Sequence, residues 1–210
     1  MKTITGRIAG HTYAYAEGAD TQAPPLLLLH GTGGTEHDLV PLAQRLSPGS
    51  TLLSPRGNVD ENGASRFFRR IAEGVFDLDD VRTRTAALAA FIEAACAHHQ
   101  LVPGDLIALG FSNGANIAAT LLQLQPASLG GGILLRTMVV IDEPAPAGSL
   151  SDKRVLIASG DHDPLVTPDH PPRLAAHLRA GGADVTLHTS AAGHGLVAPD
   201  LEAAQRFLQR

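Results

Sequence analysis

The stretch LIALGFSNGANIA, residues 106–118, decides the fold of this chain. Its first half is an apolar run that fits a buried strand, and its second half has the spacing of a helix. Ser112 stands on the turn between them, and Gly110 and Gly114 flank it. A strand that leads directly into a helix is the repeating unit of a parallel sheet, so this stretch predicts an α/β protein.

Short apolar runs recur along the chain and alternate with stretches of helical spacing. The strand candidates are residues 26–29, 50–54, 106–111, 132–137, 154–159 and 184–189. The helical stretches between them are residues 39–46, 79–95, 117–124, 174–178 and 201–208. Residues 3–16 fit an antiparallel strand or hairpin at the sheet edge. This order predicts one domain over residues 1–210: a mostly parallel sheet with helices on both faces and no large cap domain.

Only two connections are long, residues 54–79 and residues 138–150. Residues 54–79 show little regular pattern, and they follow a strand. We therefore expect them at the carboxyl edge of the sheet, where open α/β folds bind ligands. Short connections elsewhere predict an open, shallow site. Its candidate walls, for which plain core packing is an equally good interpretation, are Phe67, Phe68, Met138 and Leu165.

Ser112 is the candidate nucleophile. A serine on a sharp strand-to-helix turn needs small neighbours two residues away on each side, and glycines stand there. The N-terminus of the following helix would point backbone N–H groups at developing negative charge. The alternative is an ordinary turn with a capping serine, but the strand and helix on either side favour the nucleophile.

A serine nucleophile needs a histidine base and an acid, which follow it in the chain in α/β-hydrolases. His194, between two glycines after the last strand candidate, fits both the order and the position; His170 is the runner-up. Asp161 and Asp163 both follow the strand candidate at residues 154–159, and their positions leave the choice open. Asp161 also fits a turn-forming residue.

The glycine-rich loop HGTGG, residues 30–34, follows the first buried strand candidate. It lacks the Gly-Lys-Ser/Thr ending of a phosphate-binding loop and the third glycine of a dinucleotide fingerprint. Its position matches the loop that donates an N–H group to an oxyanion hole. We therefore predict the backbone N–H groups of Thr32 and Asn113 as the oxyanion donors.

Together these motifs resemble the carboxylesterase/phospholipase branch of the α/β-hydrolases, which includes acyl-protein thioesterases. The matching stretches are LLLLHGTGG (26–34), IALGFSNG (107–114), GDHDPLV (160–166) and GHGL (193–196). The resemblance implies an α/β-hydrolase fold and oxyanion donors at Thr32 and Asn113. It also implies that the catalytic acid is the aspartate before proline, Asp163.

Three further stretches resemble a narrower group, the small bacterial carboxylesterases linked to quinone or metal stress: PRG (55–57), NGASRFF (62–68) and SNGAN (112–116). Typical acyl-protein thioesterases carry glutamine after the serine, where this chain has Asn113, so a lipidated protein is not the expected substrate. Dienelactone hydrolases use cysteine at the position of Ser112. The single cysteine, Cys96, fits core packing in a helix instead.

The composition limits the remaining classes. Apolar residues make up 44% of the chain, enough for a large core, and the net charge of −5 with no basic block argues against nucleic acid as a partner. No apolar run is long enough to span a membrane, and the first residues show no apolar signal core. With one cysteine, these features favour the cytoplasm, unless a leader was removed.

The sequence thus predicts a serine carboxylesterase that hydrolyses small or medium-chain esters through an acyl-serine intermediate. We expect a small-molecule ester as substrate, no cofactor or metal, and a monomer or homodimer. A thioesterase or lysophospholipase-like acyl hydrolase, and a non-catalytic binding protein of the same fold, are the alternatives. A metal hydrolase using Asp161, His162 or His194 has no supporting ligand spacing.

Overall fold

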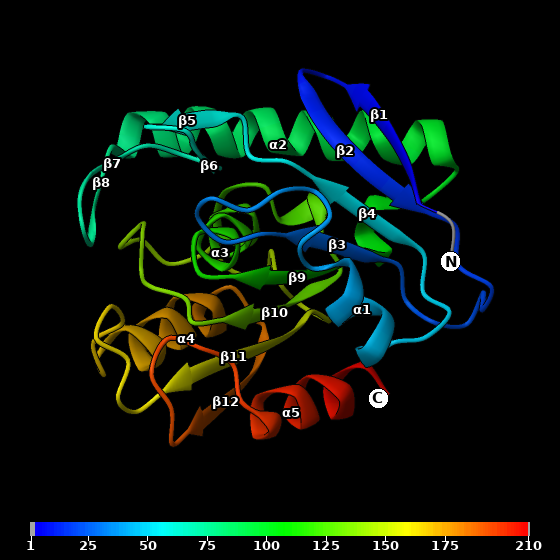
Figure 1. Ribbon diagram of the computed structural model, residues 1–210. Coiled ribbons are helices and arrows are strands. Elements are labelled where there is room, and N and C mark those ends of the chain that lie inside the picture. The colour runs from blue at the N-terminus through cyan, green and yellow to red at the C-terminus, as the bar shows by residue number, and fades with distance from the viewer. Residues whose placement is uncertain (1–2, 210) are drawn as a thin grey trace.

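The computed structural model describes residues 3–209 and is built around an eight-stranded sheet (Figure 1). In spatial order the strands are β1 (Ile4–Ile8), β2 (His11–Ala16), β4 (Leu52–Pro55), β3 (Leu26–Leu29), β9 (Ile107–Phe111), β10 (Gly131–Leu135), β11 (Arg154–Gly160) and β12 (Asp184–Ser190). β1 and β2 form an antiparallel hairpin, and β2 is antiparallel to β4. All other neighbours are parallel, which confirms the mostly parallel sheet with an antiparallel hairpin at its edge.

Helices cover both faces of this sheet (Figure 1). They are α1 (Val40–Leu46), α2 (Leu78–His99), α3 (Asn113–Leu124), α4 (His170–Ala180) and α5 (Ala198–Leu208). Successive leucines of β3 point to opposite faces, as the period of a strand requires. Leu27 and Leu29 belong to the core under α2, α3 and α4. Leu26 and Leu28 belong to the core under α1 and α5. All four are fully buried, which explains why this strand is an unbroken apolar run.

The connection at residues 54–79 departs from the prediction, because much of it is regular. It forms two small hairpins, β5 (Val59–Glu61) with β6 (Ala64–Arg66), and β7 (Arg70–Ala72) with β8 (Val75–Phe76). Asn62 and Gly63 connect the first pair with φ of 55° and 86°. Two positive φ values are what a two-residue hairpin turn needs, and Asn-Gly is its strongest sequence signal. That dipeptide could have revealed the hairpin.

The strand predicted at residues 132–137 ends earlier, at Leu135. Arg136 follows with φ of 58°, a left-handed conformation that carries the chain out of the sheet. Two short 3₁₀ turns, Pro103–Asp105 and Pro126–Ser128, complete the regular structure of residues 3–209. Within these residues, none of the helices combines the length and the apolar character that crossing a membrane demands.

Candidate active site

Ser112 lies at the carboxyl end of β9, immediately before α3. Its backbone has φ 52° and ψ −117°, an unusual conformation for a residue other than glycine. The turn closes only because the residues two positions away on each side, Gly110 and Gly114, lack side chains. A Cβ atom at Gly114 would lie 1.9 Å from the carbonyl oxygen of Leu29, and one at Gly110 would lie 2.7 Å from Ala115. The two glycines therefore let α3 pack directly against the sheet and hold the serine at its edge.

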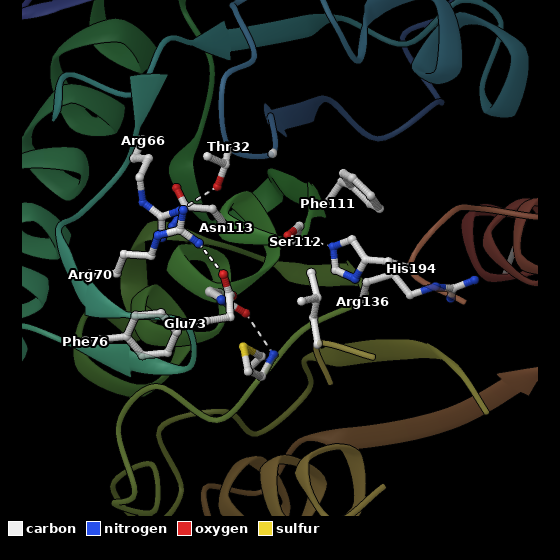
Figure 2. Close-up of a pocket in the computed structure, with 14 residues that line it drawn as sticks. Thr32, Arg66, Arg70, Glu73, Phe76, Phe111, Ser112, Asn113, Arg136 and His194 are labelled. Atoms are coloured by element: carbon white, nitrogen blue, oxygen red, sulfur yellow. Dashed lines mark hydrogen bonds and ion pairs between the residues drawn. The ribbon is translucent and has the colours of Figure 1, made fainter. Parts of the chain in front are cut away.

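Three side chains from separate loops form a continuous hydrogen-bonded chain at this edge. Nε2 of His194 lies 2.9 Å from Oγ of Ser112 (Figure 2). Nδ1 of the same ring lies 2.8 Å from Oδ2 of Asp163. The Asp163 side chain is 0% exposed, and that of His194 is 25% exposed. The other oxygen of Asp163 accepts from the backbone N–H groups of Leu165 and Val166, so the carboxylate is fixed from both sides.

The structure also places the competing candidates. Asp161 is 43% exposed; its Oδ1 lies 2.5 Å from Nδ1 of His162 and accepts from the N–H of Ala192 at 3.1 Å. His170 starts α4, and its Nδ1 accepts from the N–H of Val139 at 2.8 Å. Both residues join one loop to another, and neither takes part in the hydrogen bonds to Ser112.

Thr32 and Asn113 line the pocket that contains Ser112. Within residues 3–209, neither backbone N–H group has a hydrogen-bond acceptor. For Asn113 this follows from its place at the first position of α3, since the first N–H groups of a helix lack partners within it. Two unpaired N–H groups beside a serine hydroxyl are the arrangement that can stabilise an oxyanion.

The hairpin strand β6 and the residue after it form hydrogen bonds with the Thr32 loop and with Asn113. The carbonyl oxygen of Ser65 accepts from the N–H of Gly33 at 2.9 Å. Nη1 of Arg66 donates to Oγ1 of Thr32 at 2.6 Å, and the N–H of Phe67 donates to Oδ1 of Asn113 at 2.8 Å. Three consecutive residues thus fix the two candidate oxyanion donors relative to each other.

His30 links the Thr32 loop to the chain that follows β4. Its Nδ1 lies 2.6 Å from the carbonyl oxygen of Gly31, and its Nε2 accepts from the N–H of Gly57 at 2.9 Å. These contacts require a neutral ring that carries its proton on Nδ1. Burial lowers the pKa of His30 and keeps the ring neutral, although the contact with Gly31 works in the opposite direction.

The loop that carries His194 is held by a buried arginine that sequence reasoning missed. Nε of Arg136 donates to the carbonyl oxygen of Gly193 at 3.0 Å, and its Nη2 donates to that of Gly195 at 2.9 Å. The guanidinium also pairs with Asp200, with Nη2 to Oδ2 at 2.6 Å. Burial alone would raise the pKa of Asp200, but the hydrogen bonds from Arg136 and from the N–H of Val197 outweigh it and hold the pKa below its ordinary value.

The pocket around Ser112 has a volume of about 230 Å³ (Figure 2). Its apolar walls are Phe76, Phe111, Met138 and Leu165, and its charged walls include Arg66, Arg70 and Glu73. Met138 and Leu165 were both expected at this site. Among residues 3–209, no cluster of three or more His, Cys, Asp or Glu side chains could hold a metal ion.

Phe67 and Phe68 require a correction. Both are buried in the core under α2 and α3, with exposed fractions of 2% and 0%, so they do not form the pocket wall. Phe76, at the end of the second hairpin, supplies an aromatic wall instead. The link between the two hairpins carries the apolar pair into the core, whereas Arg66, Arg70 and Phe76 of the hairpins face the pocket. Because the hairpins were not predicted, this inversion was not foreseen.

The chain is similar in sequence and in structure to known hydrolases and carboxylesterases. No protein-family model matches the chain. MhqD of Bacillus subtilis (strain 168), provisionally named a hydrolase, is 44% identical over 185 residues, which cover 87% of this chain and 90% of that protein. The crystal structure of the Bacillus cereus carboxylesterase has a TM-score of 0.90 and 41% identity, covering 95% of this chain and 93% of that one. A carboxylesterase from Mesorhizobium loti has a TM-score of 0.90 and 34% identity, with 99% and 98% covered.

Proposed function

Since the chain belongs to the carboxylesterase branch of the α/β-hydrolases, we propose that it is a serine esterase that hydrolyses small or medium-chain carboxylic esters through an acyl-serine intermediate. The observation that carries the proposal is the unbroken hydrogen-bonded chain from Ser112 through His194 to Asp163. These hydrogen bonds make the serine hydroxyl a usable nucleophile, because the imidazole can remove its proton and the carboxylate stabilises the resulting imidazolium.

In the first half of the proposed reaction, Oγ of Ser112 attacks the ester carbonyl carbon while Nε2 of His194 takes the hydroxyl proton. The carbonyl oxygen becomes an oxyanion, which accepts hydrogen bonds from the N–H groups of Thr32 and Asn113. The C–O bond to the alcohol then breaks. His194 gives its proton to the departing alcohol, and the acyl group remains on Ser112.

In the second half, water replaces the alcohol. His194 takes a proton from water as the water oxygen attacks the acyl carbon, and the same two N–H groups hold the oxyanion. The bond to Oγ of Ser112 breaks, His194 returns the proton to Oγ, and the carboxylic acid leaves. Asp163 keeps Nδ1 of His194 as the proton-bearing nitrogen throughout both halves.

The pocket supports small or medium acyl groups as substrates. A volume of about 230 Å³ is below the range of ordinary drug-sized ligand sites, about 300–1,000 Å³. We propose that Met138, Leu165, Phe76 and Phe111 contact the hydrocarbon part of the substrate.

Replacing Ser112 with alanine tests the mechanism. We expect esterase activity to fall by orders of magnitude with no change in the circular dichroism spectrum, and labelling by a fluorophosphonate probe to disappear. A non-catalytic binding protein would show no labelling in the wild type. Full activity in the Ser112→Ala variant would reject the mechanism. The same chemistry cleaves thioesters, so parallel assays with a matched ester and thioester decide between an esterase and a thioesterase.

A further inference from the structure

One wall of the pocket carries positive charge. Arg66 ends β6 and Arg70 begins β7, and both line the cavity around Ser112. Figure 2 shows them grouped with Glu73 on the side of Ser112 away from His194. The alkyl part of a simple ester makes no ionic contact with such a wall, whereas an ionised group on the substrate would.

Arg66 has donor capacity left over. Its side chain is only 3% exposed, its Nε donates to the carbonyl oxygen of Phe68 at 3.2 Å, and its Nη1 donates to Oγ1 of Thr32 at 2.6 Å. Within residues 3–209, its Nη2 makes no hydrogen bond, and it is not one of the completely enclosed polar atoms. Since Arg66 lines the pocket, the small exposed part of this guanidinium opens onto the substrate space.

The nearby carboxylates make their hydrogen bonds to Arg70 and not to Arg66. Glu61 accepts from Nε of Arg70 at 3.0 Å, and Glu73 accepts from its Nη1. Oε2 of Glu61 forms a looser ion pair with Nη1 of Arg66 at 3.8 Å, which is beyond hydrogen-bond distance. Arg66 is therefore a buried cation without a hydrogen-bonded carboxylate. Such a group is costly, and an anion that reaches its free N–H groups gains a strong, charge-assisted bond.

We propose that Arg66 binds a carboxylate group of the substrate, so that the preferred substrates are short esters carrying a second, ionised carboxyl group, such as half-esters of small dicarboxylic acids. The position agrees with this, because Arg66 is bonded to the side chain of Thr32, whose N–H is a proposed oxyanion donor. The charged end of the substrate would thus lie a few atoms from the ester carbonyl. This inference rests on the proposed esterase function.

Matched substrates test the proposal. Monomethyl succinate and monomethyl glutarate are compared with their neutral amide counterparts, methyl succinamate and methyl glutaramate, by pH-stat titration at pH 7.5. We expect kcat/KM to be about tenfold or more higher for an acid than for its amide, because the amide cannot form the charge-assisted hydrogen bond with Arg66. An acid hydrolysed no faster than its amide would overturn the proposal. Failure of the esterase function is a different result: none of the four esters is hydrolysed and the fluorophosphonate probe does not label the protein.

Variants test whether Arg66 is the source of the preference for the acid over the amide. Arg66→Met should bring the acid-to-amide ratio of kcat/KM close to one, and Arg66→Lys should keep part of it. Both rates will also fall, since Arg66 holds Thr32, and the ratio is therefore the readout. Arg69→Met is the matched control, because Arg69 is 62% exposed and pairs with Asp77 away from the pocket; its ratio should equal that of the wild type. An Arg66→Met variant with the wild-type ratio would overturn the proposal.

A measurement on the wild type keeps the test open if Arg66→Met does not fold. Glutarate, the free dicarboxylate, should inhibit hydrolysis of a neutral ester competitively, and the inhibition should weaken as salt is added. Glutaramide, its neutral counterpart, should inhibit at least about tenfold more weakly. Equal inhibition by the two compounds would contradict a cationic subsite.

Discussion

Arg136 and Asp200 form an ion pair that is entirely enclosed, with Nη2 of the arginine 2.6 Å from Oδ2 of the aspartate and neither side chain exposed. The remaining donors of Arg136 hold the carbonyl oxygens of Gly193 and Gly195, the residues on either side of His194. The pair therefore sets the position of the imidazole without touching it, and it joins β10, the His194 loop and α5.

Removing one partner of this pair should cost stability and activity together. Arg136→Met leaves Asp200 as an uncompensated buried charge, so we expect the free energy of unfolding to fall by about 3–5 kcal/mol. Urea denaturation measures this. The double variant Arg136→Met with Asp200→Leu removes both charges and should recover much of the stability, since apolar replacements of buried pairs are often neutral. It should not recover kcat, because the carbonyl oxygens of Gly193 and Gly195 would still lack the hydrogen bonds from Arg136. A double variant with wild-type kcat would show that Arg136 does not position His194.

The two aspartates of the loop after β11 should behave differently when each is made neutral. Asp163→Asn keeps the shape but favours the wrong tautomer of His194, so kcat should fall by about 10⁴-fold, the loss known for this change in a serine protease triad. Asp161→Asn removes only contacts between loops and should change kcat less than about tenfold. Steady-state kinetics with one small ester measures both. Equal losses of kcat in the two variants would show that Asp163 is not the catalytic acid.

The small pocket predicts a limit on the acyl chain. In a series of nitrophenyl esters from acetyl to dodecanoyl, kcat/KM should be highest for short and medium chains. It should be at least about tenfold lower for dodecanoyl, since a chain that does not fit loses transition-state binding. A steady rise up to dodecanoyl would contradict the assignment of Met138 and Leu165 as the walls of a shallow site.

Two buried histidines predict how stability depends on pH. Burial lowers the pKa of His11 and of His30 from the ordinary value of 6.5, so the folded protein resists protonation there. Well above pH 6.5 both rings are neutral in the folded and in the unfolded state, so they do not make stability depend on pH. As pH falls below 6.5, the unfolded chain takes up protons first, and the free energy of unfolding should drop by up to ~1.4 kcal/mol per pH unit for each histidine. Burial also lowers the pKa values of His99 and His170, which add to the effect in the same pH range, whereas Glu36 and Asp200, whose pKa values are lowered, contribute only at more acidic pH.

Urea denaturation at pH 7.5 and 5.5 checks this dependence. In His30→Gln, which has no titrating ring, the difference in stability between the two pH values should be smaller than in the wild type. An unchanged difference in His30→Gln would exclude His30 as a source of the effect.

The sequence was informative where local pattern and burial agree. Leu26–Leu29 is buried on both faces, so its apolar run identified a central strand directly. The turn around Ser112 needs glycines for steric reasons that the chain itself displays. Arg136 is the opposite case. An arginine after a strand is ordinarily exposed, and only its partner 64 positions later in the chain makes its burial possible. Phe67 and Phe68 were misplaced because they lie in the link between two hairpins, and apolar spacing does not encode the direction of that link.

Much of the pocket wall comes from one short piece of chain. Arg66, Arg70, Glu73 and Phe76 all lie in the two hairpins between β4 and α2, whereas Ser112, Asp163 and His194 follow strands of the main sheet. The stretch that would set substrate choice also holds the proposed oxyanion donors, because Arg66 bonds to Thr32 and Phe67 bonds to Asn113. Grafting this stretch from one family member onto another should change selectivity, and it should keep the reaction only where the residues at positions 65–67 still bond to the Thr32 loop and to Asn113.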